Sequence, residues 1–393
     1  MRTSRLLLLP VLALAAGMLT APAAQATGAD PVRFATFNAS LNRGAAGQLV
    51  TDLSTPDNAQ AREVAEVIQR NRPDVLLINE FDYAPPAVDL FRDNYLERGQ
   101  NGARPIDYPY AFIAPSNTGV LTGFDLDRNG STDTGNDAHG FGLFEGQYGM
   151  LVLSKYPIDT RAVRTFQNFL WADMPNALLP DDPATSAPKD WYSPEILEVL
   201  RLSSKSHWDV PIKVGRRTVH FLVSHPTPPT FDGAEDRNGT RNHDEIRFWA
   251  DYLSPGRSGY VYDDAGKRGG LKPGDRFVVA GDNNSDPKDG DSVPGAIQQL
   301  LTAPRVIDTH PGSVGGYLAA REQGGANVGH RTNPFFDTAD FNDNAPGNLR
   351  VDYVLPSHGL APIGSAVYWP TGELARLNDA SDHHLVRVDV LVR

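Results

Sequence analysis

The sequence predicts a globular α/β protein whose core is built from short apolar strands and a few helices. Hydrophobic residues make up 40% and charged residues 21% of the 393 residues, which is enough apolar content to bury a sizeable core. Glycine (36) and proline (31) are frequent, which indicates many turns and argues against a helical bundle or a coiled coil. Apolar runs of strand length recur along most of the chain, whereas segments with helical spacing are few.

The first 26 residues have the pattern of a secretory signal peptide. Arg2 and Arg5 precede an apolar run over residues 6–19, and Ala24-Gln25-Ala26 follows as a small-x-small cleavage site. This run is too short and wrongly flanked for a spanning helix. We therefore expect residues 1–26 to be removed and the protein to be secreted to the extracellular space; an uncleaved membrane anchor is the alternative.

The remaining chain, residues 27–393, is expected to form one large domain without stable membrane association. No later apolar run approaches 18 residues, and no linker divides the chain. Cysteine is absent, which excludes disulfides, thiolate metal sites and a cysteine nucleophile. The formal net charge of −12 disfavours non-specific binding of duplex nucleic acid through a basic surface. The sequence gives no indication of the oligomeric state.

The periodicity of apolar residues predicts the order of the elements. Strands are expected over 32–37, 74–80, 149–154, 218–224, 276–282, 349–355 and 385–392. Helical spacing predicts a helix over 58–70, which Pro73 ends, and a second helix over 241–253. The long intervening segments are expected to be surface insertions: 100–147, 159–208, 254–275 and 310–348.

Four of these strands have a polar residue at or next to their C-terminal ends. The residues are Asn38, Glu80, His225 and Asp282. One polar strand end is unremarkable, but all four of these side chains can bind a metal ion or a phosphate. The pattern therefore predicts a single site at the rim of a sheet core.

Six motifs in order along the chain resemble the endonuclease/exonuclease/phosphatase superfamily, whose fold is that of pancreatic deoxyribonuclease and inositol-phosphate phosphatases. They are Phe37-Asn38, Ile78-Asn79-Glu80, Ser224-His225, Gly281-Asp282-Asn283-Asn284, Arg350-Val351-Asp352-Tyr353 and Ser381-Asp382-His383. The resemblance implies a deoxyribonuclease I-like α/β fold. This is a two-layer sandwich of mainly antiparallel sheets flanked by helices, here with long loop insertions. It places the site at one end of the sandwich, where the strand ends converge.

The resemblance also implies a divalent cation and its ligands. Glu80 is the expected principal ligand, Asp382 a further one, and Asn38 holds either metal-bound water or a phosphate oxygen. Hard cations prefer such oxygen ligands, and a cation offsets the charge on a transferring phosphoryl group. Mg²⁺ is the expected ion, with Mn²⁺ and Ca²⁺ as alternatives. Nucleases of the family carry a metal-side residue where this chain has Ser40, so a second metal is in doubt.

The catalytic roles follow from the same resemblance. His383 is the expected general base, and Asp352 accepts a hydrogen bond from its other ring nitrogen. Asp282 and Asn284 are expected to orient the nucleophile and the phosphate. His225 is expected either to bind a phosphate oxygen or to protonate the leaving group.

Two further segments have open interpretations. Arg241 and His243, with Arg247 after them, either bind a substrate phosphate or form a solvated helix face. The tract over residues 205–211 either lines the site or packs Trp208 on the sandwich.

An acidic loop resembles the first nine positions of a calcium-binding loop. Asp125, Asp127, Asn129 and Asp133 occupy its ligand positions 1, 3, 5 and 9, with Gly130 at position 6. Position 12 is Asn136 rather than Glu, and no helix precedes the loop. A loop that binds structural Ca²⁺ and a plain acidic turn are therefore both retained.

The leading functional hypothesis is a secreted metal-dependent phosphoesterase acting on a small phosphate ester. An extracellular nuclease is the alternative enzyme, and a phospholipid substrate and a non-catalytic binding module are further ones. The acidic charge and Ser40 favour a small ester over nucleic acid. A binding module has no need of the His383 and Asp352 pair, which favours an enzyme.

Overall fold

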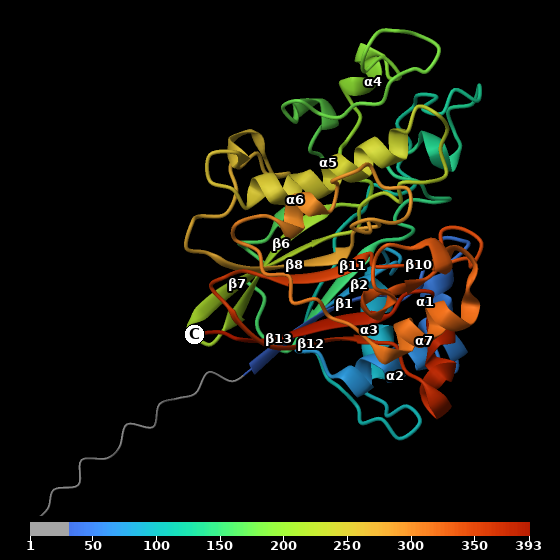
Figure 1. The fold of residues 1–393 in the computed structure, drawn as a ribbon. Coiled ribbons are helices and arrows are strands. Elements are labelled where there is room, and N and C mark those ends of the chain that lie inside the picture. The colour runs from blue at the N-terminus through green and yellow to red at the C-terminus, as the bar shows by residue number, and fades with distance from the viewer. Residues whose placement is uncertain (1–30) are drawn as a thin grey trace, which may run out of the picture.

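A computed structural model describes residues 31–393, so the predicted signal peptide lies outside the described residues. Two sheets pack face to face with helices outside each (Figure 1). The first sheet has the order β12 (Ala361–Tyr368), β13 (Leu385–Leu391), β1 (Pro31–Asn38), β2 (Val75–Asn79), β4 (Met150–Ser154) and β3 (Tyr110–Phe112). The second has the order β11 (Asp352–Pro356), β8 (Arg276–Asp282), β7 (Arg217–Ser224), β6 (His207–Val214) and β5 (Arg164–Thr165).

Each sheet is antiparallel except for one parallel pair near its middle. β1 runs parallel to β2 in the first sheet, and β7 runs parallel to β8 in the second. A separate hairpin joins β9 (Ala339–Asp340) to β10 (Asn348–Leu349). The predicted α/β sandwich of mainly antiparallel sheets is confirmed.

The helices cover the outer faces of the two sheets. The α-helices are α1 (Gln48–Leu53), α2 (Ala59–Asn71), α3 (Pro85–Phe91), α4 (Pro194–Leu197), α5 (Arg237–Tyr252), α6 (Gln298–Leu301) and α7 (Val314–Gln323). Short segments of 3₁₀ or π helix occur at Arg92–Leu96, Gly135–Asp137, Trp171–Asp173, Ser258–Tyr260, Gly325–Gly329, Pro334–Phe336 and Gly372–Ala380. No helix in the part of the chain that the structure describes is long and apolar enough to span a bilayer.

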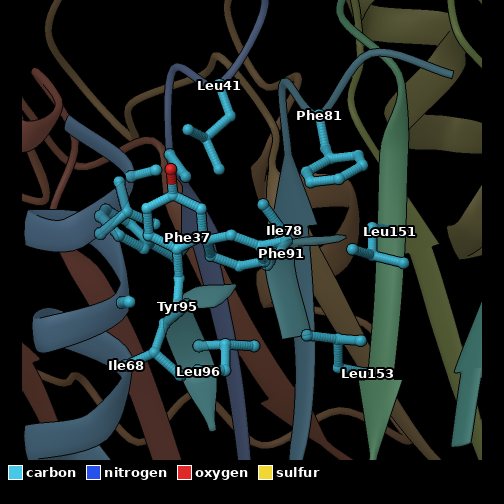
Figure 2. Close-up of a cluster of buried hydrophobic side chains, with 14 of the residues drawn as sticks. Phe37, Leu41, Ile68, Ile78, Phe81, Phe91, Tyr95, Leu96, Leu151 and Leu153 are labelled. Atoms are coloured by element: carbon cyan, nitrogen blue, oxygen red, sulfur yellow. The ribbon is translucent and has the colours of Figure 1, made fainter. Parts of the chain in front are cut away.

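Successive side chains of each strand point to opposite faces of the sheet, which divides the core into layers. In β1, Phe34 points between the sheets, where its ring centroid lies 5.6 Å from that of Phe221 in β7. Its neighbours Ala35 and Phe37 face the opposite side and pack against the outer helices. Figure 2 shows this outer cluster, which includes Phe37 and Ile78 of the sheet and Ile68 of α2. Apolar side chains therefore pack against both faces of β1, which fixes the position of its C-terminal end.

The predicted helix over 58–70 is confirmed as α2 to within one residue at each end. Asn58 caps it, because its side-chain oxygen accepts a hydrogen bond of 3.0 Å from the main-chain nitrogen of Ala61. Arg72 ends it with a positive φ of 51° just before Pro73. The second predicted helix is α5, which begins four residues earlier than the spacing indicated.

Six of the seven predicted strands are confirmed to within one residue at each end, and the seventh is divided. The run over 349–355 separates into β10 and β11 because two main-chain N–H groups between them bond to side chains. Arg350 donates to Asp286 Oδ2 at 2.9 Å and Val351 donates to Thr338 Oγ1 at 3.0 Å. β6 and β12 have no counterpart among the predictions. The interpretation that Trp208 packs on the sandwich is confirmed, because its ring stands edge-on to Phe112 at 5.0 Å.

Candidate active site

Strand direction brings the predicted site residues to one end of the sandwich. β1 and β2 run parallel, so Asn38 at the end of β1 lies near Glu80, which follows β2. β7 and β8 run parallel in the other sheet, so His225 and Asp282 lie at the same end. β11 is antiparallel to β8, and its first residue, Asp352, is the register partner of Asp282.

Asp282 lies at the centre of this group. Its Oδ2 is 3.2 Å from Asn38 Nδ2, 3.4 Å from His225 Nε2 and 3.6 Å from His383 Nε2. Its Oδ1 accepts a 2.8 Å hydrogen bond from the main-chain nitrogen of Asn284. The pKa of Asp282 is raised to about 7, chiefly by burial; the charge of His383 opposes this rise and that of Asp352 adds to it. The carboxylate therefore depends on nearby positive charge to stay ionised.

His383 and Asp352 form the predicted pair. Nδ1 of His383 is 2.9 Å from Asp352 Oδ2, which also accepts a 2.8 Å hydrogen bond from Thr338 Oγ1. Burial alone lowers the pKa of His383, but Asp352 and Asp282 outweigh it and hold that pKa well above its usual value. The pair turns Nε2 of the ring toward Asp282 and makes the imidazole a stronger base than an isolated histidine. Thr338 is a supporting residue that the sequence analysis did not identify.

Glu80 and its neighbours supply oxygen atoms that fit a divalent cation. Glu80 Oε1 is 3.2 Å from Asn38 Nδ2, the same amide nitrogen that contacts Asp282. Burial raises the pKa of Glu80, and Asp382 adds to that rise. Asp382 itself is exposed at the rim, with Oδ1 3.3 Å from Ser40 Oγ. The half-buried carboxylate of Glu80 and the exposed carboxylate of Asp382 supply the oxygen ligands that a hard cation prefers.

A metal ion also has a second geometric option. One ligand atom each of Asp282, Asp352 and His383 lies within 4.8 Å of the others. Asp352 and His383 are hydrogen-bonded to each other, and a metal ion bound by both would replace that hydrogen bond. The side of Asp282 that faces Glu80 is therefore the better cation site.

His225 is held in a neutral state. Burial, together with Lys205 and His383, keeps the pKa of His225 well below its usual value. Within residues 31–393, its buried Nδ1 has no hydrogen-bond partner. A neutral ring is a poor acid but a good N–H donor, so the geometry favours binding of a phosphate oxygen over protonation of the leaving group.

Lys205 is a cationic site residue to which the sequence analysis gave no role. It immediately precedes Ser206 and β6, is 7% exposed, and lines a cavity together with Glu80 and His225. Burial lowers its pKa, while Glu245, Glu80 and Asp282 oppose that shift. Among the described residues, no hydrogen bond or ion pair engages its ammonium group. The tract over 205–211 therefore fulfils both open interpretations, since it lines the site and packs Trp208.

The two residues of α5 that were predicted to bind substrate, Arg241 and His243, lie in different surroundings. Arg241 lines the same cavity as Lys205, but its guanidinium donates to main-chain oxygens of Leu202, Arg201 and His139. His243 does not line the cavity, and its Nδ1 is 3.0 Å from Asp244 Oδ1. Substrate binding by either residue stays a prediction.

The residues that follow Asp282 and His383 differ in whether they face the site. Asn284 lines the site with φ 50° and donates from Nδ2 to Pro226 O at 3.1 Å. Asn283 is turned inward, where its Nδ2 is 3.3 Å from Gly281 O. His384 faces away from the site and stacks on Trp369 at 3.7 Å.

The acidic loop contains a different set of carboxylates from the predicted one. Asp125 and Asp127 come together with the buried Asp137, each offering an oxygen within 4.8 Å of the others. Asp133 instead accepts a hydrogen bond from Ser131 Oγ, and the side chain of Asn129 accepts one from the main chain of Ser131. Calcium binding by this loop stays a prediction.

Comparison with known proteins agrees with this geometry. The model of a family described as the Endonuclease/Exonuclease/phosphatase family matches residues 35–383. No curated protein matches the chain.

Three solved structures match the chain at low sequence identity. An endonuclease/exonuclease/phosphatase from Beutenbergia cavernae is 16% identical with a TM-score of 0.50, and the match covers 92% of this chain and 71% of that one. A truncated TDP2 from Caenorhabditis elegans is 15% identical with a TM-score of 0.46, covering 92% and 98%. Sphingomyelinase C from Streptomyces griseocarneus is 16% identical with a TM-score of 0.46, covering 92% and 99%.

Proposed function

Because the chain belongs to the endonuclease/exonuclease/phosphatase family, we propose that it hydrolyses a phosphate ester with the help of a divalent cation. One observation carries the proposal. The hydrogen bond between His383 and Asp352 directs Nε2 of the imidazole toward Asp282, and the carboxylate of Glu80 contacts the same Asn38 amide as Asp282. A proton acceptor and an acidic cation site therefore face the same small volume.

The chain's own side chains account for the steps around phosphorus. Glu80 and Asp282 would hold a divalent cation such as Mg²⁺, which would supply Lewis-acid stabilisation of the phosphoryl oxygens. Asp282 and Asn284 orient a water molecule, and His383 Nε2 takes its proton as the oxygen attacks phosphorus. His225 and Lys205 donate hydrogen bonds to phosphoryl oxygens, whose charge increases in the transition state.

The ester bond to phosphorus breaks as the new bond to the water oxygen forms, and the departing oxygen takes up a proton. The products are an alcohol and a phosphate with one ester bond fewer. Mg²⁺ is the proposed ion, with Mn²⁺ and Ca²⁺ as alternatives. We further propose that the enzyme acts outside the cell, on the strength of the leader over residues 1–26.

A substrate panel tests the proposed function. Purified protein stripped of metal is assayed on a monoester, a diester, phytate, plasmid DNA and a phosphocholine lipid, each with Mg²⁺, Mn²⁺ and Ca²⁺. We expect hydrolysis of at least one ester that depends on the added ion and is reversed by a chelator. Hydrolysis in excess chelator, or none with any ion, contradicts the proposal. An extracellular nuclease is the alternative, and rapid plasmid nicking with negligible monoesterase activity supports it.

A further inference from the structure

Two cavities diverge from the candidate active site. Each has a volume of about 580 Å³. They share Glu80 and His225, together with Pro228, Thr230 and Phe231 of one loop. A phosphorus atom bound between Glu80 and His225 therefore has open space on two sides.

The first cavity, which we name the basic lobe, is rich in cationic and aromatic side chains. Lys205, Arg237 and Arg241 are its cations, and Glu80 is the only carboxylate among the lining residues within 31–393. Phe141, Tyr148 and Tyr192 add aromatic surface to its walls. This lobe extends from the site toward the insertion over residues 100–147.

The second cavity, which we name the acidic lobe, has the opposite charge. Its lining includes Asp282, Asp286, Asp291 and Asp382, without any lysine or arginine among the described lining residues. It also has apolar surface from Phe341, Leu349 and Val351, and the ring of Phe341 stands edge-on to His383 at 5.3 Å. The two lobes are therefore distinct compartments rather than one uniform groove.

The wall between the lobes carries an exposed aromatic residue in a restricted conformation. Phe231 is 83% exposed and has a φ of 66°, which is unfavourable for a bulky side chain. Ser40, Glu80, Tyr148 and Asn284 also line the lobes with positive φ. Such strain concentrates at functional sites, which supports a role in binding for this wall.

From this arrangement we propose that the substrate is a phosphodiester, with one organic substituent in each lobe. This inference rests on the proposed function and narrows its substrate class. A phosphomonoester has a single organic group, so it leaves one lobe without an occupant. The charged phosphoryl oxygens of a monoester also gain nothing from the apolar walls of the second lobe, whereas a carbon substituent buries them.

The reaction retains one of the two substituents on phosphorus. The water oxygen forms a bond to phosphorus, the bond to one ester oxygen breaks, and that oxygen leaves as an alcohol after taking up a proton. The product is a phosphomonoester, whose second substituent remains in its own lobe until release.

A substrate series with one common leaving group tests the inference. The probes are 4-nitrophenyl phosphate, methyl 4-nitrophenyl phosphate and bis(4-nitrophenyl) phosphate, assayed with the ion that gives the highest activity. We expect kcat/KM to rise along the series, by roughly tenfold or more between the ends, because the second substituent gains contacts in its lobe. A monoester that is hydrolysed as well as or better than the diesters overturns the inference but leaves the proposed function standing. Failure of all three overturns both.

Variants in the two lobes provide a second test. Asn342→Trp narrows the acidic lobe, and Asn344→Trp is its control, because Asn344 is exposed on the same loop but lines neither lobe. Phe141→Ala removes a wall of the basic lobe, and Leu143→Ala is its control, with exposures of 53% and 65%. We expect the lobe variants to lower the ratio of diester to monoester kcat/KM several-fold and the controls to leave it unchanged. Unchanged ratios in both lobe variants contradict the inference.

The source of the diester is assigned under the same conditions. Release of nucleotides from plasmid DNA identifies a nucleic acid, and release of phosphocholine from phosphatidylcholine vesicles identifies a lipid headgroup. Both contain the phosphodiester that the two lobes fit.

Discussion

The Oδ2 atom of Asp352 lies 2.9 Å from Nδ1 of His383, on a strand end that is fully buried. This contact fixes which ring nitrogen faces the site, because an imidazole bonded through Nδ1 presents Nε2 on its other edge. Asp352 comes from one sheet and His383 precedes a strand of the other. The pair therefore depends on how the two sheets pack, and it orients the group that the proposed reaction needs.

The first prediction concerns the cation ligand. Glu80→Gln should lower kcat by roughly 10²-fold or more, because a neutral amide binds a divalent cation more weakly than a carboxylate does. Initial rates at saturating substrate measure it, and thermal unfolding verifies the fold. Glu373→Gln is the control, since Glu373 is exposed and lines neither lobe. Near-normal turnover by Glu80→Gln contradicts the assigned role.

The second prediction concerns the proton acceptor. His383→Ala should lower kcat by roughly 10²–10⁴-fold, the usual effect of a positioned acid–base group. Asp352→Asn should affect the same step, so the double variant should lose far less than the two single losses combined. Steady-state kinetics on the four proteins measure this coupling. Independent, additive losses indicate that the two side chains do not act as a pair.

The third prediction concerns Lys205. Lys205→Met should lower kcat/KM by roughly 10²-fold, because it removes a cation that lines the cavity beside Glu80 and His225. Among the described residues, none forms a hydrogen bond or ion pair with this ammonium group, so it is available to the phosphoryl oxygens. Lys272→Met, which changes an exposed lysine away from both lobes, should have no effect. A loss confined to stability, with normal kinetics of the folded fraction, assigns Lys205 a structural role instead.

The fourth prediction concerns stability at low pH. His207 is 1% exposed, and burial lowers its pKa to about 4, so the folded protein keeps it neutral. The unfolded chain protonates it below about pH 6.5, so this residue's contribution to the free energy of unfolding is lost as the pH falls from 6.5 toward 4. Each unit of difference between the folded and unfolded pKa corresponds to about 1.36 kcal/mol, so the free energy of unfolding falls by roughly 3 kcal/mol.

Urea unfolding at pH 7 and pH 4.5 measures this effect in the wild type and in His207→Asn. The variant should be less stable at pH 7, because two hydrogen bonds of the ring, to Ser203 Oγ at 2.6 Å and Glu245 O at 2.9 Å, are disturbed. Its additional loss on acidification should be smaller than that of the wild type. His358→Gln, at an exposed position, should follow the wild type. Equal acid sensitivity of all three proteins contradicts the prediction.

Much of the site was predictable because its residues stand at the ends of apolar strands. The alternation of Phe34 and Phe37 in β1 and the apolar run before Glu80 define strands by local pattern alone. Once such strands end in Asn38, Glu80, His225 and Asp282, their order along the chain is sufficient to suggest one common site. The N-cap residue Asn58 and the proline that follows the helix end, Pro73, are equally local signals.

Tertiary packing decided the roles of residues whose local sequence has no distinctive pattern. Thr338 contacts Asp352 and Lys205 lines the cavity only because distant segments meet at one end of the sandwich. Arg241 looks like a free cation in the sequence, yet three main-chain oxygens from other segments engage it. The two lobes likewise arise from loops brought together across the chain. Local periodicity determines which residues a strand presents, but the packing of two sheets determines which partners they meet, and partners set both charge state and function.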